Sequence, residues 1–509
     1  MISTVNSSVL RGIDGFTVNV ETDISNGLPA FEIVGLPDAA VKESKERIRS
    51  AIKNSGITMP SKHIVVNLAP ADVKKEGTHF DLPIALGILT ASGQLEIENS
   101  GECMFLGELS LGGTLRSVNG VLPMVISAYQ SGVKKVFLPK ENACEAAVVS
   151  GIEVFGAETL ADITGHFTKQ KELVPEKIDV DSLFAAADNA FDMADVKGQT
   201  FVKRALEIAA AGGHNILMIG PPGSGKTMIA QRIPSILPDM SFEEALEVTK
   251  VHSIAGALSA NSPIVTERPF RHPHHTISSV GLSGGGSRPR PGEISLSHNG
   301  VLFLDELPEF RRDALEVMRQ PLEDGKITIT RAGGTVTYPC SVMLVASMNP
   351  CPCGYYGDRT HECTCTQTQI MRYMSKISGP LLDRIDLHIE VPAVKYEELE
   401  TAERGESSAE IRARVNRARK LQLSRYAGTG VYSNSRLTPE LTDKFCALDH
   451  ETGEVMRTAF ESLGLSARAH NRILKVARTI ADLEGSECIE TEHIAEAIQY
   501  RALDRKFFA

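Results

Sequence analysis

A glycine-rich stretch that ends in a lysine and a threonine is the clearest chemical feature of this sequence. NILMIGPPGSGKT, residues 215–227, carries the pattern G-x-x-x-x-G-K-[ST] directly after a short apolar run. Glycines let backbone N–H groups close around phosphate oxygens, and the helix that follows presents its N-terminus to the anion. Lys226 would reach the β- and γ-phosphates of ATP, and Thr227 would hold Mg²⁺. The predicted phosphate-binding residues are Gly220, Pro221, Pro222, Gly223, Ser224, Gly225, Lys226 and Thr227.

Two further apolar runs end in polar side chains of the kind that this chemistry needs. GVLFLDELPEF, residues 300–310, ends its run in Asp305 and Glu306, and SVMLVASMNP, residues 341–350, ends in Asn349. The carboxyl ends of parallel strands meet at one edge of a sheet, so these side chains are expected beside the phosphate loop. We predict that Asp305 completes the Mg²⁺ shell, Glu306 polarises the attacking water and Asn349 senses the γ-phosphate.

An arginine precedes a further apolar run in GPLLDRIDLHIEV, residues 379–391. Arg384 has two interpretations. It could pair with Asp383 or Asp386, or it could reach the γ-phosphate bound to a neighbouring subunit.

Four cysteines form two C-x-C pairs, separated by nine residues, in NPCPCGYYGDRTHECTC, residues 349–365. Such a loop can place four thiolates tetrahedrally around Zn²⁺, although C-x-C is tighter than the usual zinc spacing. A redox role is disfavoured because no C-x-x-C motif is present. We predict a structural zinc site at Cys351, Cys353, Cys363 and Cys365, with His361 as a substitute ligand and free thiols as the alternative.

Composition limits the classes of protein that the chain can represent. The 509 residues carry a net charge of -11, which argues against a nucleic-acid affinity spread over the whole surface. No apolar run reaches about 18 residues, and the first residues lack a signal-peptide pattern. Nine cysteines, an odd number, argue against a disulfide framework. We therefore expect a cytoplasmic protein of about three domains with no membrane segment.

Positive charge is concentrated locally. Residues 268–292 contain four arginines, three histidines and no acid, and their glycines and prolines predict a mobile surface loop. Residues 411–425 contain six basic residues and predict an amphipathic helix with Val415 and Leu423 on one face. Residues 325–339 alternate apolar and polar side chains around Gly333 and Gly334, which predicts a β-hairpin. Taken alone, the loop and the helix are best explained as solvated surface.

The order of these motifs resembles AAA+ ATPases, in which VKGQ at 196–199 matches the motif on the adenine side. HPHHT, GVLFLDELPEF, AxMNPCPCG and SGPLLDRIDL are similar to the magnesium-chelatase-like group and, within it, to the ComM/YifB family. The resemblance implies a homo-hexameric ring in which a helix-2 insert, here 268–292, and a hairpin, here 325–339, point into the pore. It assigns adenine contacts to Val196 and Gly198, a finger role to Arg384, and a sensor-2 role to Arg468 with Arg472 as the alternative. The residues expected to contact DNA are Arg268, Arg271, Arg288, Arg290, Lys326 and Arg331.

The first 165 residues predict an α+β domain that resembles the proteolytic domain of Lon and the related domain of RadA. Residues 63–93 read as strand, loop and helix, and residues 105–123 as two short strands. Where Lon has its nucleophilic serine this chain has His79, and Leu122 stands where the basic lysine would be. A Ser-Lys dyad needs both a hydroxyl and an amine. Proteolysis is therefore not expected, and His79 is best explained as structural.

The predicted fold is an α/β P-loop AAA+ parallel-sheet core with a helical lid, preceded by an α+β Lon-protease-like domain of ribosomal S5 domain 2 type. The predicted domains are residues 1–165 for the Lon-like domain, 166–190 for a linker, 191–394 for the core and 395–509 for the lid. The predicted function is that of a ring-shaped ATPase motor that moves branch points in DNA during transformation or recombination. The predicted ligands are ATP, Mg²⁺ and Zn²⁺. The predicted partners are branched or single-stranded DNA and recombination proteins. A metal-insertion motor and a protease or unfoldase component remain the alternatives.

Overall fold

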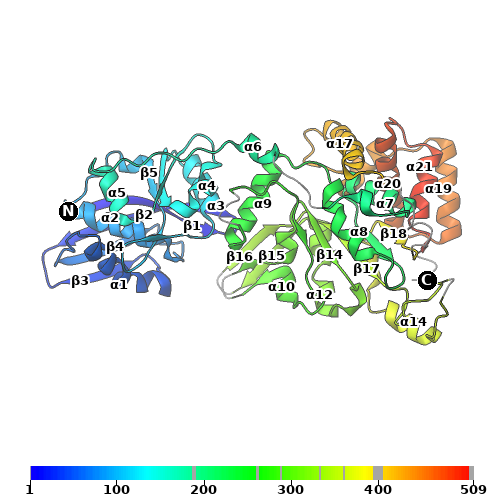
Figure 1. Cartoon of the computed structure of the whole chain (residues 1–509), viewed down its shortest axis with the longest axis horizontal. Coiled ribbons are helices and arrows are strands. Elements are labelled where there is room, and N and C mark those ends of the chain that lie inside the picture. Colours follow the sequence, from blue (N-terminus) through cyan, green and yellow to red (C-terminus); the bar gives the residue numbers. More distant parts are fainter. Residues whose placement is uncertain are drawn as a thin grey trace. The chain divides into compact units, whose positions relative to one another are not determined.

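The computed structural model describes residues 2–185, 191–258, 263–286, 289–331, 334–358, 361–393 and 405–503. The chain forms two compact units (Figure 1). The first consists of Met1–Ala186 and Phe242–Thr266, and the second of Ala187–Ser241 and Glu267–Ala509. In the described part of the chain, no helix is long and apolar enough to cross a membrane.

The first unit is built on a mixed sheet with the strand order β3-β4-β2-β1-β5-β8-β9. Its strands are β1 (Ile2–Arg11), β2 (Asp14–Ser25), β3 (Ala30–Val34), β4 (His63–Ala69), β5 (Cys103–Phe105), β8 (Lys135–Pro139) and β9 (Glu153–Ala157). The first two strands form a long antiparallel pair that turns between Arg11 and Asp14. Side chains of β4 alternate between buried and half-buried, as expected for a strand with only one face fully covered.

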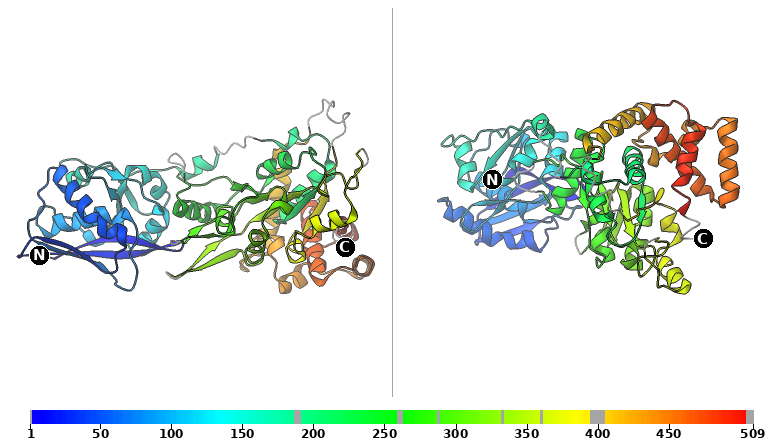
Figure 2. Two further views of the ribbon diagram at one scale, coloured as in Figure 1. Left: turned by 90° about the horizontal axis from the view of Figure 1, so that it is seen from below. Right: turned by 45° about the vertical axis from the view of Figure 1, so that its right-hand side comes forward.

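Helices α1 to α5 of the first unit pack around its sheet (Figure 2), and α6 lies on the segment that leaves it. They are α1 (Ala39–Asn54), α2 (Asp81–Ala91), α3 (Val121–Gln130), α4 (Lys140–Ala147), α5 (Leu160–Phe167) and α6 (Val180–Ala185). Short elements complete the unit, namely η1 (Thr78–Phe80), η2 (Ser100–Glu102), β6 (Glu108–Leu109) and β7 (Leu115–Arg116). Helix α2 is buried over nearly its whole length and packs on β1 and β2. The strand, loop and helix predicted for residues 63–93 are confirmed.

A helix from the middle of the chain also belongs to the first unit. Helix α9 (Phe242–Ala255) packs against α3, and the N–H of Gly120 donates a hydrogen bond of 3.1 Å to the carbonyl oxygen of Ser253. The hydroxyl of Ser253 donates to the carboxylate of Glu145. The sequence between the phosphate loop and residue 267 therefore leaves the second unit and returns to it, which the motif pattern did not anticipate.

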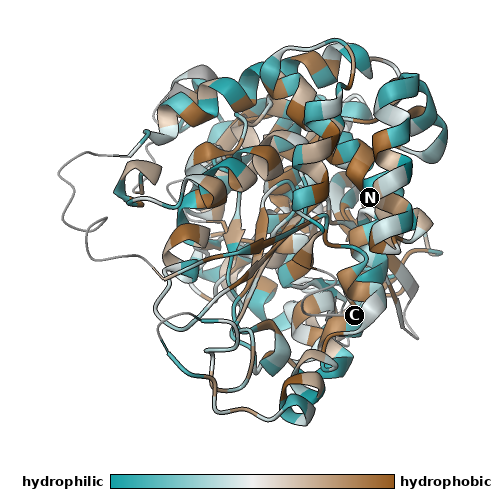
Figure 3. Cartoon of the chain, turned by 90° about the vertical axis from the view of Figure 1, so that its right-hand side faces the viewer, coloured by the Kyte–Doolittle hydropathy of each residue, from teal (hydrophilic) through white to brown (hydrophobic). Residues whose placement is uncertain are grey.

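The second unit has a five-stranded sheet in which every neighbouring pair is parallel, in the order β11-β14-β17-β10-β18. Its strands are β10 (Ile216–Ile219), β11 (Phe270–Arg271), β14 (Val301–Leu304), β17 (Met343–Met348) and β18 (Leu387–Glu390). Strands β10, β14 and β17 are buried throughout, as in a sheet covered by helices on both faces. Figure 3 shows these apolar strands running between helices with mixed faces.

The connections of the second unit carry short helices around this sheet. They are η3 (Met193–Asp195), α7 (Thr200–Gly212), α8 (Lys226–Arg232), η4 (Ile233–Ile236), α10 (Ser279–Ser283), α11 (Glu293–Leu296), η5 (Leu307–Glu309), α12 (Arg312–Glu316), α13 (Arg319–Asp324), α14 (Gln367–Met374) and α15 (Gly379–Leu382). Helix α7 packs beside β18. Strand β11 lies inside the segment predicted to be a mobile basic loop. That prediction is wrong for residues 270 and 271, which form the edge of the sheet, and for the residues of α10, β12 and β13, which lie in the same segment.

Two small hairpins project from this unit and pack together. The predicted hairpin is confirmed as β15 (Lys326–Arg331) and β16 (Gly334–Pro339), and a second one pairs β12 (Gly284–Gly285) with β13 (Arg290–Pro291). The hydroxyl of Tyr338 donates a hydrogen bond of 2.8 Å to the carbonyl oxygen of Pro289. Gly284 has a φ of +92°, and a Cβ there would lie 3.0 Å from Cδ1 of Ile329. The insert and the hairpin therefore form one structure.

The C-terminal helices pack on the sheet helices through one continuous apolar core. They are α17 (Ser408–Arg425), η6 (Asn434–Arg436), α18 (Pro439–Phe445), α19 (His450–Leu463), α20 (Ala467–Glu484) and α21 (Thr491–Gln499). Helix α20 begins after the cap Ser466 and ends at Gly485, as predicted. Helix α17 is also confirmed, but Leu423 is exposed, and the buried stripe instead runs through Ile411, Val415 and Ala418.

Candidate active site

The phosphate loop connects β10 to α8 in the second unit. Gly225, with a φ of +87°, precedes the first helical residue, Lys226, a backbone conformation that suits glycine. The Nζ atom of Lys226 donates hydrogen bonds of 2.7 and 2.8 Å to the carbonyl oxygens of Gly220 and Pro221. Burial lowers the pKa of Lys226, while Asp305 and Glu306 act in the opposite direction. The ammonium group of Lys226 is thus hydrogen-bonded to the first two residues of the phosphate loop.

The acidic pair lies directly opposite this loop. Asp305 follows the buried strand β14 and accepts a hydrogen bond of 2.6 Å from Oγ1 of Thr227. Its other carboxylate oxygen accepts a hydrogen bond from the hydroxyl of Ser347, on the neighbouring strand β17. Glu306 adopts a φ of +55°, and its carboxylate lies 3.6 Å from Nδ1 of His275. The two residues predicted to hold Mg²⁺ are in contact, and the predicted water-polarising carboxylate is next to them.

The predicted sensor residue reaches the same point from β17. Oδ1 of Asn349, directly after β17, lies 3.3 Å from Nζ of Lys226, the first residue of α8, and β17 and β10 are neighbouring strands. The structure therefore brings Lys226, Thr227, Asp305 and Asn349 together, because β10, β14 and β17 are parallel neighbours that end at one edge of the sheet.

The residues predicted to contact adenine are connected to the phosphate loop. Val196 is buried, and Gly198 and Gln199 both have positive φ, at +61° and +52°. The Nε2 group of Gln199 donates a hydrogen bond of 3.2 Å to the carbonyl oxygen of Ser224. A displacement of the 196–199 turn would therefore also displace the phosphate loop at Ser224.

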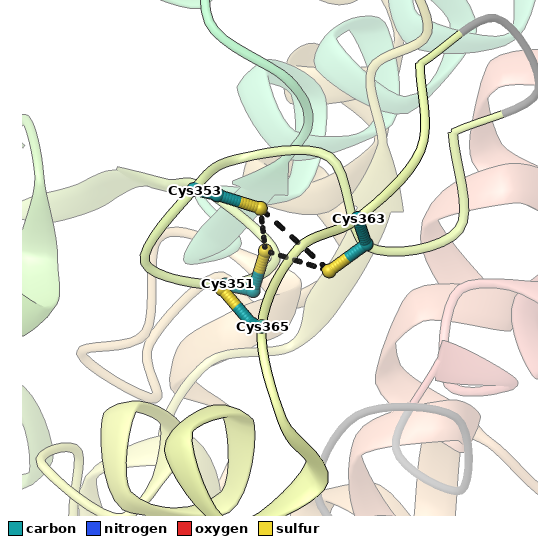
Figure 4. A group of neighbouring side chains, drawn as sticks. All are labelled: Cys351, Cys353, Cys363 and Cys365. Atoms are coloured by element: carbon teal, nitrogen blue, oxygen red, sulfur yellow. Dashed lines mark hydrogen bonds between the residues drawn. The ribbon is translucent and has the colours of Figure 1, made fainter.

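The four cysteines form a compact cluster (Figure 4). The sulfur of Cys351 lies 3.3 Å from that of Cys353 and 3.7 Å from that of Cys363, and Cys353 and Cys363 are 3.6 Å apart. With Cys365 included, all four sulfurs lie within 4.8 Å of one another. His361 does not belong to this group. Its ring stacks on Tyr355 at 4.8 Å, so its prediction as a substitute ligand gains no support.

Arg384 makes neither of the intramolecular ion pairs considered from the sequence. Its guanidinium pairs with Glu323, which lies on α13, and donates a hydrogen bond of 2.7 Å to the carbonyl oxygen of Pro380. The Nε atom is buried without a hydrogen-bond partner. An arginine held at its tip by an exposed carboxylate can exchange that partner for another anion.

The two candidate sensor-2 arginines differ sharply in environment. Arg468 is 67% exposed and lies 3.8 Å from the Asp383 carboxylate. Arg472 pairs with the buried Asp386, which also accepts from His214 at 3.3 Å. Burial opposes ionisation of Asp386, yet the Arg472 guanidinium and His214 outweigh it and hold the pKa of this carboxyl well below its usual range. Arg472 is therefore committed to a buried carboxylate, and Arg468 is the more exposed of the two arginines.

Three family models match successive parts of the chain. Those described as magnesium chelatase, subunit ChlI, and as subunit ChlI of Mg-chelatase match residues 192–399 and 20–142. The model of the ChlI C-terminal part matches residues 405–501. Competence protein ComM of Haemophilus influenzae is 46% identical over 507 residues, which cover 99% of this chain and 98% of that protein. The chain belongs to the ComM/YifB family of magnesium-chelatase-like AAA+ proteins.

Other relatives match the whole chain or one part of it. YifB of Escherichia coli strain K12 is 45% identical over 505 residues, covering 99% of this chain and 98% of that protein. Lon protease 2 of Bacillus subtilis is 30% identical over 168 residues, covering 31% of this chain and 29% of that protein. The ComM/YifB family membership implies ATP and Mg²⁺ as ligands and an oligomeric assembly, and the Lon match agrees with a Lon-like domain.

The basic residues of this ComM/YifB-family chain divide into two sets. Arg268 donates to the carbonyl oxygens of Pro238 and Asn299 at 2.6 and 2.8 Å, and Arg271 makes a bidentate pair with Glu293 at 2.7 and 2.9 Å. These contacts anchor the edge of the sheet, so the expectation of two mobile charges there is wrong. Arg290 and Lys326 are exposed on the paired hairpins. Arg331 is placed only by its backbone, opposite Gly334, and Arg288 lies outside the described residues.

Two of the basic side chains of helix α17 form ion pairs with other residues of the second unit. Arg414 pairs with Glu207 and Glu406, and Arg425 makes a bidentate pair with Asp482 at 2.6 and 3.0 Å. The interpretation of this helix as solvated surface is therefore wrong for Arg414 and Arg425, which are engaged in ion pairs with other elements of the unit.

The Lon-like site has lost the groups needed for acyl transfer. His79 is buried in η1, directly before α2, and its Nε2–H donates a hydrogen bond of 2.8 Å to the carbonyl oxygen of Ser8. Burial lowers the pKa of His79 to about 4. Leu122 is fully buried in α3. A neutral histidine committed to a carbonyl and an aliphatic side chain cannot replace a hydroxyl nucleophile and its amine base.

Several site residues were not predicted from the sequence. Ser347, His275 and Gln199 contact Asp305, Glu306 and the phosphate loop respectively. Ser347 gave one signal, since it is the only hydroxyl in the otherwise apolar stretch MLVASM. The other two lie in loops whose approach to the site depends on the tertiary fold.

Proposed function

We propose that this chain forms a ring-shaped homo-hexameric motor in which ATP hydrolysis drives the movement of DNA. The observation that supports this most strongly is the meeting of Lys226, Thr227, Asp305 and Asn349 at one sheet edge. Within that reaction class, we propose branch migration during the integration of DNA in transformation or recombination, because a relative with matching length is a competence protein. Recombination proteins would be transient partners, and the cytoplasm the site of action.

Each residue of the site has a role in the proposed hydrolysis. Lys226 and the N–H groups of the phosphate loop bind the β- and γ-phosphates, and Thr227 and Asp305 would hold Mg²⁺. Glu306 orients the attacking water, and Asn349 couples Lys226 to the state of the γ-phosphate. Arg384 and Arg468 act on nucleotide bound by a neighbouring subunit. Two observations support this role: Arg468 is exposed, and Glu323, the ion-pair partner of Arg384, is an exposed carboxylate.

DNA contact is proposed at the paired hairpins. Arg290 and Lys326 are exposed there, and Thr328 and Thr337 place paired hydroxyls on the same outer surface, 3.1 Å apart. Ammonium, guanidinium and hydroxyl groups are the usual donors to phosphate oxygens. Six copies of this structure around one axis would make a positive channel in an acidic particle, which suits a nucleic-acid backbone. Arg268 and Arg271 are engaged in contacts at the edge of the sheet and are not part of this proposed surface.

A metal-insertion motor is the competing function, since the family models that match are those of magnesium chelatase. It would use the same ATP site. The absence of the Ser-Lys pair at His79 and Leu122 argues against the third possibility, a protease component, while leaving the ATP-driven unfolding of proteins to be tested.

ATPase stimulation distinguishes these functions. ATP hydrolysis by the full chain should rise with synthetic forked or four-way DNA junctions and stay at its basal rate with casein or with porphyrin plus Mg²⁺. The protein should also convert the junctions into branch-migrated products, and Lys226→Ala is the inactive control. Stimulation by porphyrin plus Mg²⁺ alone would assign the motor to metal insertion, and stimulation by casein alone would assign it to protein unfolding.

A further inference from the structure

The cysteine cluster has the dimensions of a tetrahedral thiolate site. Four sulfurs that each lie about 2.3 Å from one zinc ion are separated by roughly 3.8 Å. The separations from Cys351 to Cys363 and from Cys353 to Cys363 are 3.7 and 3.6 Å. No acidic or histidine side chain joins the group among the described residues, so the donor set is purely sulfur. Such a set favours Zn²⁺ over the oxygen-seeking Mg²⁺ and Ca²⁺.

The loop that carries these thiols is pressed against the phosphate loop. Gly354, directly after Cys353, has a φ of +90°, and a Cβ added there would lie 2.5 Å from Cδ and 2.7 Å from Cγ of Pro222. Pro222 is the third residue of the phosphate loop. The N–H of Gly354 donates a hydrogen bond of 3.0 Å to the carbonyl oxygen of Cys351, which closes a tight turn at this contact. Only a residue without a side chain allows this approach.

The same loop begins at the predicted sensor. Asn349 contacts Lys226, and Cys351 follows two residues later as a fully buried side chain. The segment between Cys351 and Cys365 contains no helix or strand in its described residues, so no regular backbone hydrogen-bond ladder fixes its conformation. Ordering such a segment costs conformational entropy, and a metal ion bound by four of its side chains would offset that cost.

We propose that the four cysteines bind one Zn²⁺ and that this zinc site clamps the phosphate loop through Gly354 and Pro222, so that zinc occupancy sets ATP affinity and turnover. The inference rests on the ATP site of the proposed function and is independent of DNA. Zinc would supply no chemistry to hydrolysis. It would hold the turn at Gly354 against Pro222 and the Asn349 amide against Lys226.

Metal content and ATP binding of the full chain test the proposal, in protein purified without chelator. Elemental analysis should find about one zinc per chain. Cys363→Ser should lose that zinc and weaken binding of a fluorescent ATP analogue by about tenfold or more, because small displacements in such sites are costly. Cys488→Ser removes an exposed thiol on the α20–α21 connection and is the matched control, with zinc and ATP affinity unchanged. Zinc-free wild-type protein, or iron in its place, overturns the proposal.

Chelation of zinc from the wild-type protein tests the same proposal without a substitution, so misfolding of a variant cannot explain the result. Wild-type protein stripped with a zinc chelator should lose ATP affinity and regain it when zinc is added back. Unchanged ATP binding in the stripped protein overturns the clamp.

Gly354→Ala separates the clamp from the metal. It keeps all four thiols, so zinc should remain, but its methyl group must displace Pro222 and should raise the Kd for ATP. Normal ATP binding by zinc-loaded Gly354→Ala overturns the coupling. Because no DNA is present in these assays, failure of branch migration would leave this result untouched, and absence of zinc would leave the DNA proposal standing.

Discussion

The hydroxyl of Thr227 donates a hydrogen bond of 2.6 Å to the carboxylate of Asp305, although 78 residues separate the two in the sequence. The contact exists because β10 and β14 lie in one parallel sheet with only β17 between them, so that their carboxyl ends share one edge. Both side chains are proposed ligands of Mg²⁺, and Glu306 follows Asp305 immediately. Binding and hydrolysis of ATP should therefore be separable by mutation.

We expect Lys226→Ala to lose ATP binding, because it removes the ammonium that faces the phosphates. Glu306→Gln should keep ATP binding and lower turnover by a factor of about 10² or more, because an amide cannot accept a proton from water. Binding of a fluorescent ATP analogue and steady-state phosphate release measure the two effects. Wild-type hydrolysis by Glu306→Gln would show that the water-polarising residue has been assigned wrongly.

Arg384→Ala should lower turnover by a factor of about 10³, because a finger arginine neutralises charge that develops on the transferred phosphoryl group. Since the finger would act across a subunit interface, mixing Arg384→Ala with Lys226→Ala subunits should restore part of the activity. Glu323→Gln, which removes the negative charge of the intramolecular partner, serves as a control that should keep turnover. No recovery at any mixing ratio would exclude action between subunits.

The two lid arginines should give opposite results. Arg472→Ala leaves the Asp386 carboxylate buried without its guanidinium, which should cost about 3 kcal/mol or more in the free energy of unfolding. Arg468→Ala, at an exposed position, should change that free energy by less than about 0.5 kcal/mol and lower ATP turnover instead. Denaturant unfolding and ATPase rates distinguish them. A stable Arg472→Ala protein with low turnover would reverse the assignment.

His79 should make the protein sensitive to acid. Its pKa is lowered to about 4 by burial, so the unfolded chain binds the proton more readily than the folded one. The contribution of neutral His79 to the free energy of unfolding is fully present above the ordinary histidine pKa. It is lost as pH falls from about 6.5 to about 4, and the total loss is up to about 3 kcal/mol. His79→Gln keeps a donor for Ser8 without a titrating group. Calorimetry of the full chain should show a smaller loss of Tm between about pH 7 and about pH 5 for the variant; an equal loss would assign the acid sensitivity elsewhere.

The sequence was informative wherever a local pattern fixes a local structure. An apolar run followed by Asp305 or Asn349 indicates a buried strand and a polar edge, and Ser466 and Gly485 bound helix α20 because capping depends on adjacent residues. Those patterns were sufficient to assemble the phosphate site.

Long-range partners could not be predicted in the same way. Arg271 looks like a free cation in a glycine-rich stretch, and only the fold brings Glu293 to it. Helix α9 shows no sign in its own residues that it packs on α3, because an apolar stripe does not identify its partner. Strand β11 has two residues, too few for an alternation to be recognised.

The exposed charges on the paired hairpins should determine DNA binding. The structure leaves Arg290 and Lys326 as exposed cations there, whereas Arg268 and Arg271 are engaged in holding the edge of the sheet. Each phosphate contact releases condensed counterions, so the double change Arg290→Ala with Lys326→Ala should flatten the dependence of DNA affinity on salt. Branch migration should fall while basal ATPase survives, since neither residue belongs to the nucleotide site. Arg457→Ala, which removes an exposed charge from α19, is the matched control and should leave the salt dependence unchanged. If the double variant binds and migrates junctions like the wild type, the hairpins do not grip DNA, and the exposed positions of helix α17 become the surface to change next.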